Sequence, residues 1–139
     1  MTFSDIQGCR FLIVEDETLI AVLIEDALVE MGCEIVGLSG RLDTALQLAN
    51  DGEFDAAILD ITIRGGKVYP IAELLAARCI PFAFASGYGD WALPEAFRDR
   101  PRLMKPFTLR ALREQIRALC KNAATGKTKD ALTGCVPTK

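Results

Sequence analysis

Four short apolar stretches of the chain each end in side chains that could take part in phosphoryl chemistry. These side chains are Glu15 with Asp16, Asp60, Ser86 and Lys105. Carboxylate oxygens are the ligands that magnesium prefers, while a hydroxyl and an ammonium group can bind phosphate oxygens. If folding brings these groups together, the chemistry they support is transfer of a phosphoryl group to a carboxylate.

The composition removes several other kinds of chemistry. The chain contains no histidine, which excludes His-based catalytic triads, most zinc catalysis and a phosphohistidine carrier. Five cysteines occur without a CxxC pair, so we expect reduced thiols rather than a metal site or a disulfide framework. The formal net charge of −3 lacks the basic excess of a nucleic-acid-binding face.

The termini and the apolar stretches suggest where the protein acts. No apolar run approaches the roughly 20 residues of a membrane span. Residues 1–6 lack the basic-then-apolar order of a secretion signal. We therefore expect a cytoplasmic protein with no membrane contact.

The elements that must position the candidate residues alternate between strands and helices. Strands are predicted at 10–14, 33–38, 54–60, 79–85 and 103–104. Apolar residues at helical spacing predict helices at 19–31, 42–49, about 68–78 and 109–119. Gly32 is suited to end the first helix, and Thr108 to cap the last one.

This alternation predicts an α/β fold with a doubly wound, five-stranded parallel sheet in the flavodoxin-like order 2-1-3-4-5. We divide the chain into a short N-terminal lead (1–7), one domain (8–121) and a polar, disordered tail (122–139). Ligands bind such a sheet at the carboxyl ends of its strands, where the strand order reverses. Glu15, Asp16 and Asp60 would meet there, with Asp60 as the nucleophile.

Taken singly, each of these residues is typical of an ordinary strand end, turn or helix start. Their order at successive strand ends carries the prediction. The blocks FLIVEDE (11–17), AAILDI (56–61), FASG (84–87) and KPF (105–107) resemble the signatures of response regulator receiver domains of the CheY-like superfamily.

The resemblance implies a (βα)5 receiver fold and a role for each matching residue. Asp60 would be the phosphoacceptor, and Ser86 and Lys105 would sense the phosphoryl group. Mg²⁺ (or Mn²⁺) would be bound by Asp16, Asp60 and the backbone carbonyl of Thr62, with Glu15 acting through water. The resemblance also implies a cis peptide bond between Lys105 and Pro106.

The chain departs from the common receiver pattern in two places. Arg102 stands where many receivers have a tyrosine or phenylalanine that moves on activation, and Tyr88 is a candidate substitute. PFAFASGYG (81–89) is similar to the FAT-G-Y type of single-domain receiver found mainly in alphaproteobacteria. We expect phosphorylation to order the segment 87–101, which contains Trp91 and at most a short helix.

The resemblance implies phosphorelay signalling, with a sensor histidine kinase of the HWE or a related type and a downstream protein or phosphotransfer partner. We expect slow autodephosphorylation and no other enzymatic activity. A phosphorylation-independent, receiver-like interaction domain is the alternative. A nucleotide-binding enzyme is disfavoured because VEDE (14–17) has no glycine, and a DNA-binding regulator because no recognition module follows residue 121.

Overall fold

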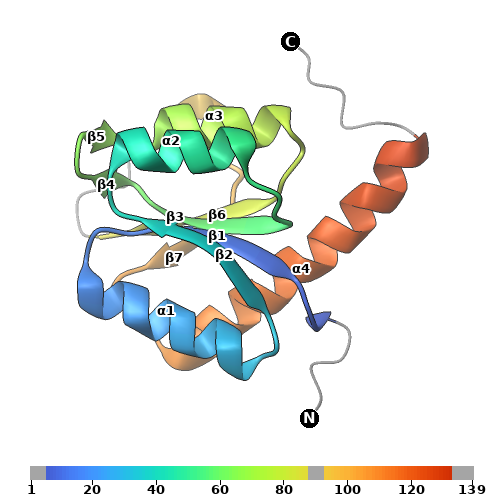
Figure 1. Cartoon of the computed structure of the whole chain (residues 1–139), viewed down its shortest axis with the longest axis horizontal. Helices are drawn as coiled ribbons and strands as arrows, with labels where there is room; N and C mark the ends of the chain where they lie inside the picture. Colours follow the sequence, from blue (N-terminus) through green and yellow to red (C-terminus); the bar gives the residue numbers. More distant parts are fainter. Residues whose placement is uncertain (1–5, 88–92, 133–139) are drawn as a thin grey trace.

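The computed structural model describes residues 6–87 and 93–132, with side chains as far as Ala123. Five parallel strands form a central sheet in the order β2-β1-β3-β6-β7 (Figure 1). The strands are β1 (Arg10–Val14), β2 (Glu34–Ser39), β3 (Ala56–Asp60), β6 (Phe82–Ser86) and β7 (Arg102–Met104). Because β1 is the first strand but lies second, the strand order reverses between β1 and β3, which confirms the predicted topology.

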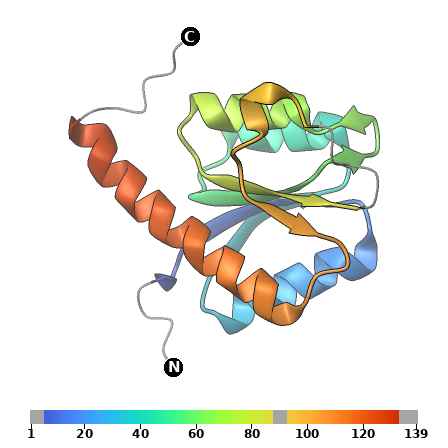
Figure 2. The same ribbon diagram turned by 180° about the vertical axis from the view of Figure 1, so that it is seen from behind.

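Helices cover both faces of the sheet. The helices α2 (Leu42–Asp51) and α3 (Tyr69–Ala77) lie on one face (Figure 1), and α1 (Thr18–Glu30) and α4 (Leu109–Leu132) on the other (Figure 2). Alternate residues of each central strand face opposite cores. In β1, Leu12 and Val14 join the core under α2 and α3, whereas Phe11 and Ile13 join the core under α1 and α4. This explains why the strands are apolar without interruption.

Local signals in the sequence set two of the helix ends. Gly32 has φ +84° after α1, the left-handed conformation that glycine adopts without strain. The Thr108 hydroxyl accepts a hydrogen bond of 3.0 Å from the backbone N–H of Ala111 at the start of α4. Both predictions are confirmed.

The last helix is longer than we expected. It continues to Leu132 and extends beyond the edge of the sheet (Figure 2), so the prediction of a disordered tail is wrong for residues 122–132. This stretch has no apolar face, but it has no proline either and is rich in alanine and lysine. A helix that has already formed can continue through such residues because each one adds a backbone hydrogen bond. The assignment of 8–121 as the domain stays a prediction.

Two short elements complete the fold. An antiparallel pair, β4 (Thr62–Ile63) and β5 (Gly66–Lys67), follows β3 and was not predicted. In the described part of the segment between β6 and β7, the helical structure is a single 3-10 turn, η2 (Glu95–Phe97), which agrees with the expected short helix.

The cysteines partly contradict the prediction. Cys9, Cys33 and Cys120 are free thiols, but Cys79 is bonded in a disulfide, so the expectation of five reduced thiols is wrong. Spacing alone could not predict this bond, because disulfide formation depends on distances set by the fold. Within the described ranges, no helix has the length and apolar character needed to cross a membrane.

Candidate phosphoryl-transfer site

The register of the sheet brings the predicted site residues to one edge. Val14 pairs with Leu59, so Glu15 and Asp60, which follow them, are neighbours at the carboxyl ends of β1 and β3. Asp60 in turn pairs with Ala85 of β6, the residue before Ser86.

Lys105 joins the same edge through β7. Its backbone N–H donates to the carbonyl of Ser86 at 2.8 Å. The peptide bond from Lys105 to Pro106 is cis, as the family resemblance implied. The side chains of positions 15, 60, 86 and 105 therefore share one end of the sheet.

The ammonium group of Lys105 contacts three carboxylates. Its Nζ lies 2.7 Å from Oε1 of Glu17, 3.1 Å from each oxygen of Glu15, and 3.3 Å from Oδ2 of Asp60. The Lys105 side chain is only 12% exposed. Burial lowers its pKa, but the hydrogen bond that it donates to Glu17 and the charges of Asp60 and Glu15 outweigh this effect and raise the pKa above its usual value. Lys105 is therefore a fixed positive charge beside the candidate nucleophile.

Glu15 has a buried carboxylate oxygen that accepts no hydrogen bond from the described residues. The residue is 3% exposed, and its Oε2 accepts hydrogen bonds from the Glu17 backbone N–H at 3.0 Å and from Lys105. Its Oε1 is buried and lies 3.1 Å from Lys105 Nζ, but it accepts no hydrogen bond from the described residues. A carboxylate oxygen can accept more than one partner, so a ligand or water at this position would stabilise the site.

Asp60 is the second buried carboxylate, with 5% exposure. Burial and the neighbouring Glu15 raise its pKa to about 8, although Lys105 acts in the opposite direction. A cation bound beside Asp60 would favour the charged form that a nucleophile needs.

The acidic residues of this edge can hold a metal ion. One oxygen from each of Glu15, Asp16 and Asp60 lies within 4.8 Å of the others. This set of hard oxygen donors, which includes a Glu15 Oε1 that accepts no hydrogen bond from the described residues, fits Mg²⁺. Asp16 is half-buried, so the third donor faces the opening of the site.

The remaining predicted residues make contacts outside this cluster. Ser86 is fully buried and its hydroxyl lies 3.5 Å from the sulfur of Met104. Thr62 begins β4, and its side-chain hydroxyl accepts a hydrogen bond of 2.8 Å from Lys67 Nζ. Arg102 opens β7, paired with Phe84, and is half-buried. Tyr88 and Trp91 lie outside the described residues, so their predicted switch roles stay predictions.

Two residues that we did not predict also shape the site. Glu17 holds Lys105, although its place in an acidic run suggested only favourable interaction with the helix dipole. Gly40 lies so close to Asp16 that a Cβ atom would be 2.6 Å from the Asp16 Cα. A glycine two residues after the predicted strand 33–38 was the available signal for such a close backbone approach.

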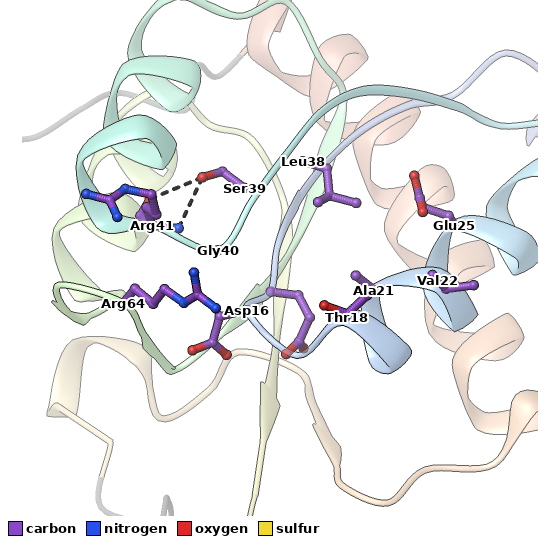
Figure 3. A pocket seen from close by; sticks show the side chains of 11 residues that line it. Asp16, Thr18, Ala21, Val22, Glu25, Leu38, Ser39, Gly40, Arg41 and Arg64 are labelled. Carbon is purple, nitrogen blue, oxygen red and sulfur yellow. Dashed lines mark hydrogen bonds between the residues drawn. The ribbon is translucent and has the colours of Figure 1, made fainter.

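A cavity of about 430 Å³ opens beside the acidic residues, between α1 and the loop after β2 (Figure 3). Asp16 lies at its centre in this view, with Arg41 and Arg64 on one side and the first turns of α1 on the other. The cavity gives the carboxylate cluster an approach route on the side of Asp16.

No family model matches the chain. The structure of SdrG from Sphingomonas melonis Fr1 is 42% identical, with a TM-score of 0.70, over 89% of this chain and 99% of SdrG. The BeF3-activated conformation of SdrG from Pseudomonas melonis Fr1 is 47% identical, with a TM-score of 0.67, over 80% of this chain and 95% of that one.

Two further proteins are more distant. The transcriptional regulatory protein PdtaR of Mycobacterium tuberculosis strain H37Rv is 33% identical over 104 residues, or 72% of this chain and 51% of PdtaR. The chain thus spans about half the length of the curated relatives it matches. A further solved structure is the receiver domain of the sensor histidine kinase PA1611 from Pseudomonas aeruginosa PAO1, with magnesium coordinated in its active-site cleft. It is 20% identical, with a TM-score of 0.66, over 82% of this chain and 98% of that one. This likeness shows the shared fold.

The extent of the match to SdrG, together with the fold and the acidic edge of the sheet, shows the family of this chain. It belongs to the receiver domains of response regulators, the phosphoacceptor modules of phosphorelay signalling.

Proposed function

We propose that this protein is a switch that accepts a phosphoryl group on Asp60 from a sensor histidine kinase. The observation that carries the proposal is the contact of one half-buried lysine, Lys105, with both Glu15 and Asp60 at the strand-order reversal. A buried carboxylate beside a fixed cation and a set of metal-binding oxygens is the arrangement that phosphoryl transfer to aspartate requires.

In the proposed reaction, an Oδ atom of Asp60 attacks the phosphorus of the donor. A bond forms between this oxygen and phosphorus, the bond from phosphorus to the donor nitrogen breaks, and the electron pair leaves with the nitrogen. Lys105 stabilises the negative charge that develops on the phosphoryl oxygens, and the Ser86 hydroxyl donates to one of them. The carboxylate needs no general base, which fits a chain without histidine.

Asp16, Asp60 and the backbone carbonyl of Thr62 would hold Mg²⁺, or Mn²⁺ in its place, with Glu15 acting through water. The ion would supply positive charge to the phosphoryl oxygens and draw the carboxylates into their charged form. The oxygen cluster of Glu15, Asp16 and Asp60 supports this role, as does the magnesium in the cleft of the PA1611 receiver domain.

Phosphorylation would change contacts with other proteins rather than start an enzymatic cycle, and water would slowly remove the phosphoryl group. SdrG has a BeF3-activated conformation, which supports a comparable response in this chain. We propose that the protein acts in the cytoplasm, and that its partners are a sensor histidine kinase of the HWE or a related type and a downstream protein or phosphotransfer partner. The FAT-G-Y-like segment 81–89 supports this choice.

The decisive experiment is intact-mass spectrometry after incubation with acetyl phosphate. Wild type with Mg²⁺ should gain one phosphoryl group, whereas Asp60→Asn, or wild type in excess EDTA, should gain none. If wild type gains no phosphoryl group while a kinase or another partner still binds it, the alternative holds, and the protein is a phosphorylation-independent interaction domain.

A further inference from the structure

Two arginines are held side by side at the rim of the cavity. Arg41 and Arg64 form an isolated parallel β-bridge, although they belong to different loops. The N–H of Arg64 donates to the carbonyl of Gly40 at 3.0 Å, and the N–H of Leu42 donates to the carbonyl of Arg64 at 2.8 Å. The backbone therefore fixes the two residues as neighbours, and Figure 3 shows the Arg64 side chain extending toward Asp16 and the Arg41 side chain extending the other way.

The protein itself does little to balance this pair. Nε of Arg41 lies 3.4 Å from Asp43, but both side chains are exposed, at 62% and 73%, and such a pair interacts weakly. Within the described ranges, no carboxylate forms an ion pair with Arg64. Two arginines on neighbouring backbone positions, without strong ion-pair partners, favour an anionic ligand.

Asp60 itself does not line the cavity, but Glu15 and Asp16 do, and one oxygen of each lies within 4.8 Å of an oxygen of Asp60. Arg41 and Arg64 line the cavity together with Asp16 and Glu15, and Figure 3 shows the Arg64 side chain pointing toward Asp16. Lys105 does not line the cavity. The acidic residues therefore have Lys105 as a cation on the β7 side, and Arg41 and Arg64 as cations on the side of the cavity.

An incoming phosphoryl group carries negative charge and would be repelled by the three carboxylates. We propose that Arg41 and Arg64 bind the phosphoryl group of the donor in this cavity and hold it for transfer to Asp60. A planar guanidinium can bind two phosphoryl oxygens at once, which suits this role better than a lysine. The donor bond stays intact at this stage and breaks only in the attack by Asp60. This inference rests on the proposed function.

The test compares phosphorylation rates of the double variant Arg41→Gln/Arg64→Gln with wild type, in Mg²⁺, over a series of donor concentrations. Two donors are used: acetyl phosphate, a small acyl phosphate, and phosphoramidate, which has the P–N bond of phosphohistidine. The second-order rate constant should fall about tenfold with both donors, as expected for lost hydrogen bonds to a charged group. The lifetime of the phosphorylated form should stay near that of wild type.

The matched control is Arg98→Gln/Arg110→Gln, which removes the same charge from exposed positions that do not line the cavity. Arg64→Lys in the wild-type background should lose less activity than Arg64→Gln. An undiminished rate with either donor, or an equal fall in the control, would overturn the inference. Failure of the proposed function has a different signature, because wild type itself would then gain no phosphoryl group.

Discussion

Oε1 of Glu17 lies 2.7 Å from Nζ of Lys105, the shortest of the contacts that this ammonium group makes with carboxylates. Glu17 is 60% exposed at its side chain, whereas Lys105 is 12% exposed, so the contact joins the surface to the buried site. Lys105 has three N–H donors, and three carboxylates surround it. A phosphoryl group on Asp60 must therefore compete with Glu17 for a donor of Lys105.

Replacing Glu17 with glutamine should make Lys105 more available to a phosphoryl group. We expect Glu17→Gln to tighten the binding of beryllofluoride, a phosphoryl mimic, by about threefold, because an exposed ion pair is worth ~0–1 kcal/mol. Titration in Mg²⁺, followed by NMR, measures this affinity. Glu73→Gln removes the same charge from an exposed position on α3 and should leave the affinity unchanged. Weaker binding in Glu17→Gln would mean that Glu17 positions Lys105 instead of competing for it.

The stability of the metal-free protein should depend on pH through Asp60. Because burial raises its pKa to about 8, from an ordinary value of 3.8, the folded state binds this proton more tightly than the unfolded state. The stability from Asp60 is then complete below its ordinary pKa and is lost as the pH rises through about 8.

Urea denaturation in EDTA measures this dependence between pH 5 and pH 8. The free energy of unfolding of wild type should fall as the pH rises, relative to that of Asp60→Asn. Adding Mg²⁺ should reverse this fall for wild type and should have no such effect on Asp60→Asn. Parallel curves for the two proteins would show that the pKa of Asp60 is not raised in the folded state.

Gly40 should be needed for metal binding although it has no side chain to contribute. In Gly40→Ala the new Cβ would lie 2.6 Å from the Asp16 Cα, so the backbone of one of them must move. We expect Mg²⁺ affinity to fall about tenfold, in the range typical of changes that disturb the support of a metal ligand. Gly87→Ala, where a Cβ meets nothing within 4 Å, is the control, and isothermal titration calorimetry gives both affinities.

Phe97 should anchor the segment between β6 and β7. It is 4% exposed, and its ring centroid lies 5.7 Å from that of Phe84 and 6.1 Å from those of Phe82 and Tyr69. Phe97→Ala should lower the free energy of unfolding by about 3–5 kcal/mol, as for other large-to-small changes in a core. The control is Leu109→Ala, at a position that is 39% exposed. Urea denaturation of both variants separates the effect of lost core packing from the effect of a substitution at the surface. Similar values for the two variants would contradict the anchoring role.

The amino-acid sequence alone determined the layers of the fold and most of the site. Apolar strands that bury both faces need helices on both sides. Parallel strands that end in Asp60 and Ser86, or end just before Asp16, must present these residues at one edge. Gly32 and Thr108 marked helix ends because their roles depend on their own backbone and side chain. The extent of α4 past residue 121 was missed because a helix that has already formed can continue without apolar periodicity.

Only the tertiary structure decided which charges meet. Glu17 and Lys105 lie far apart in the sequence, as do Arg41 and Arg64, and nothing in their local patterns selects one as the partner of the other. Strand register and loop paths bring them together, and a shift of one residue would turn a side chain to the opposite face. The electrostatics of the site therefore depend on long-range packing. The interaction energy of two charges depends on the distance between them in space and not on their separation in the sequence.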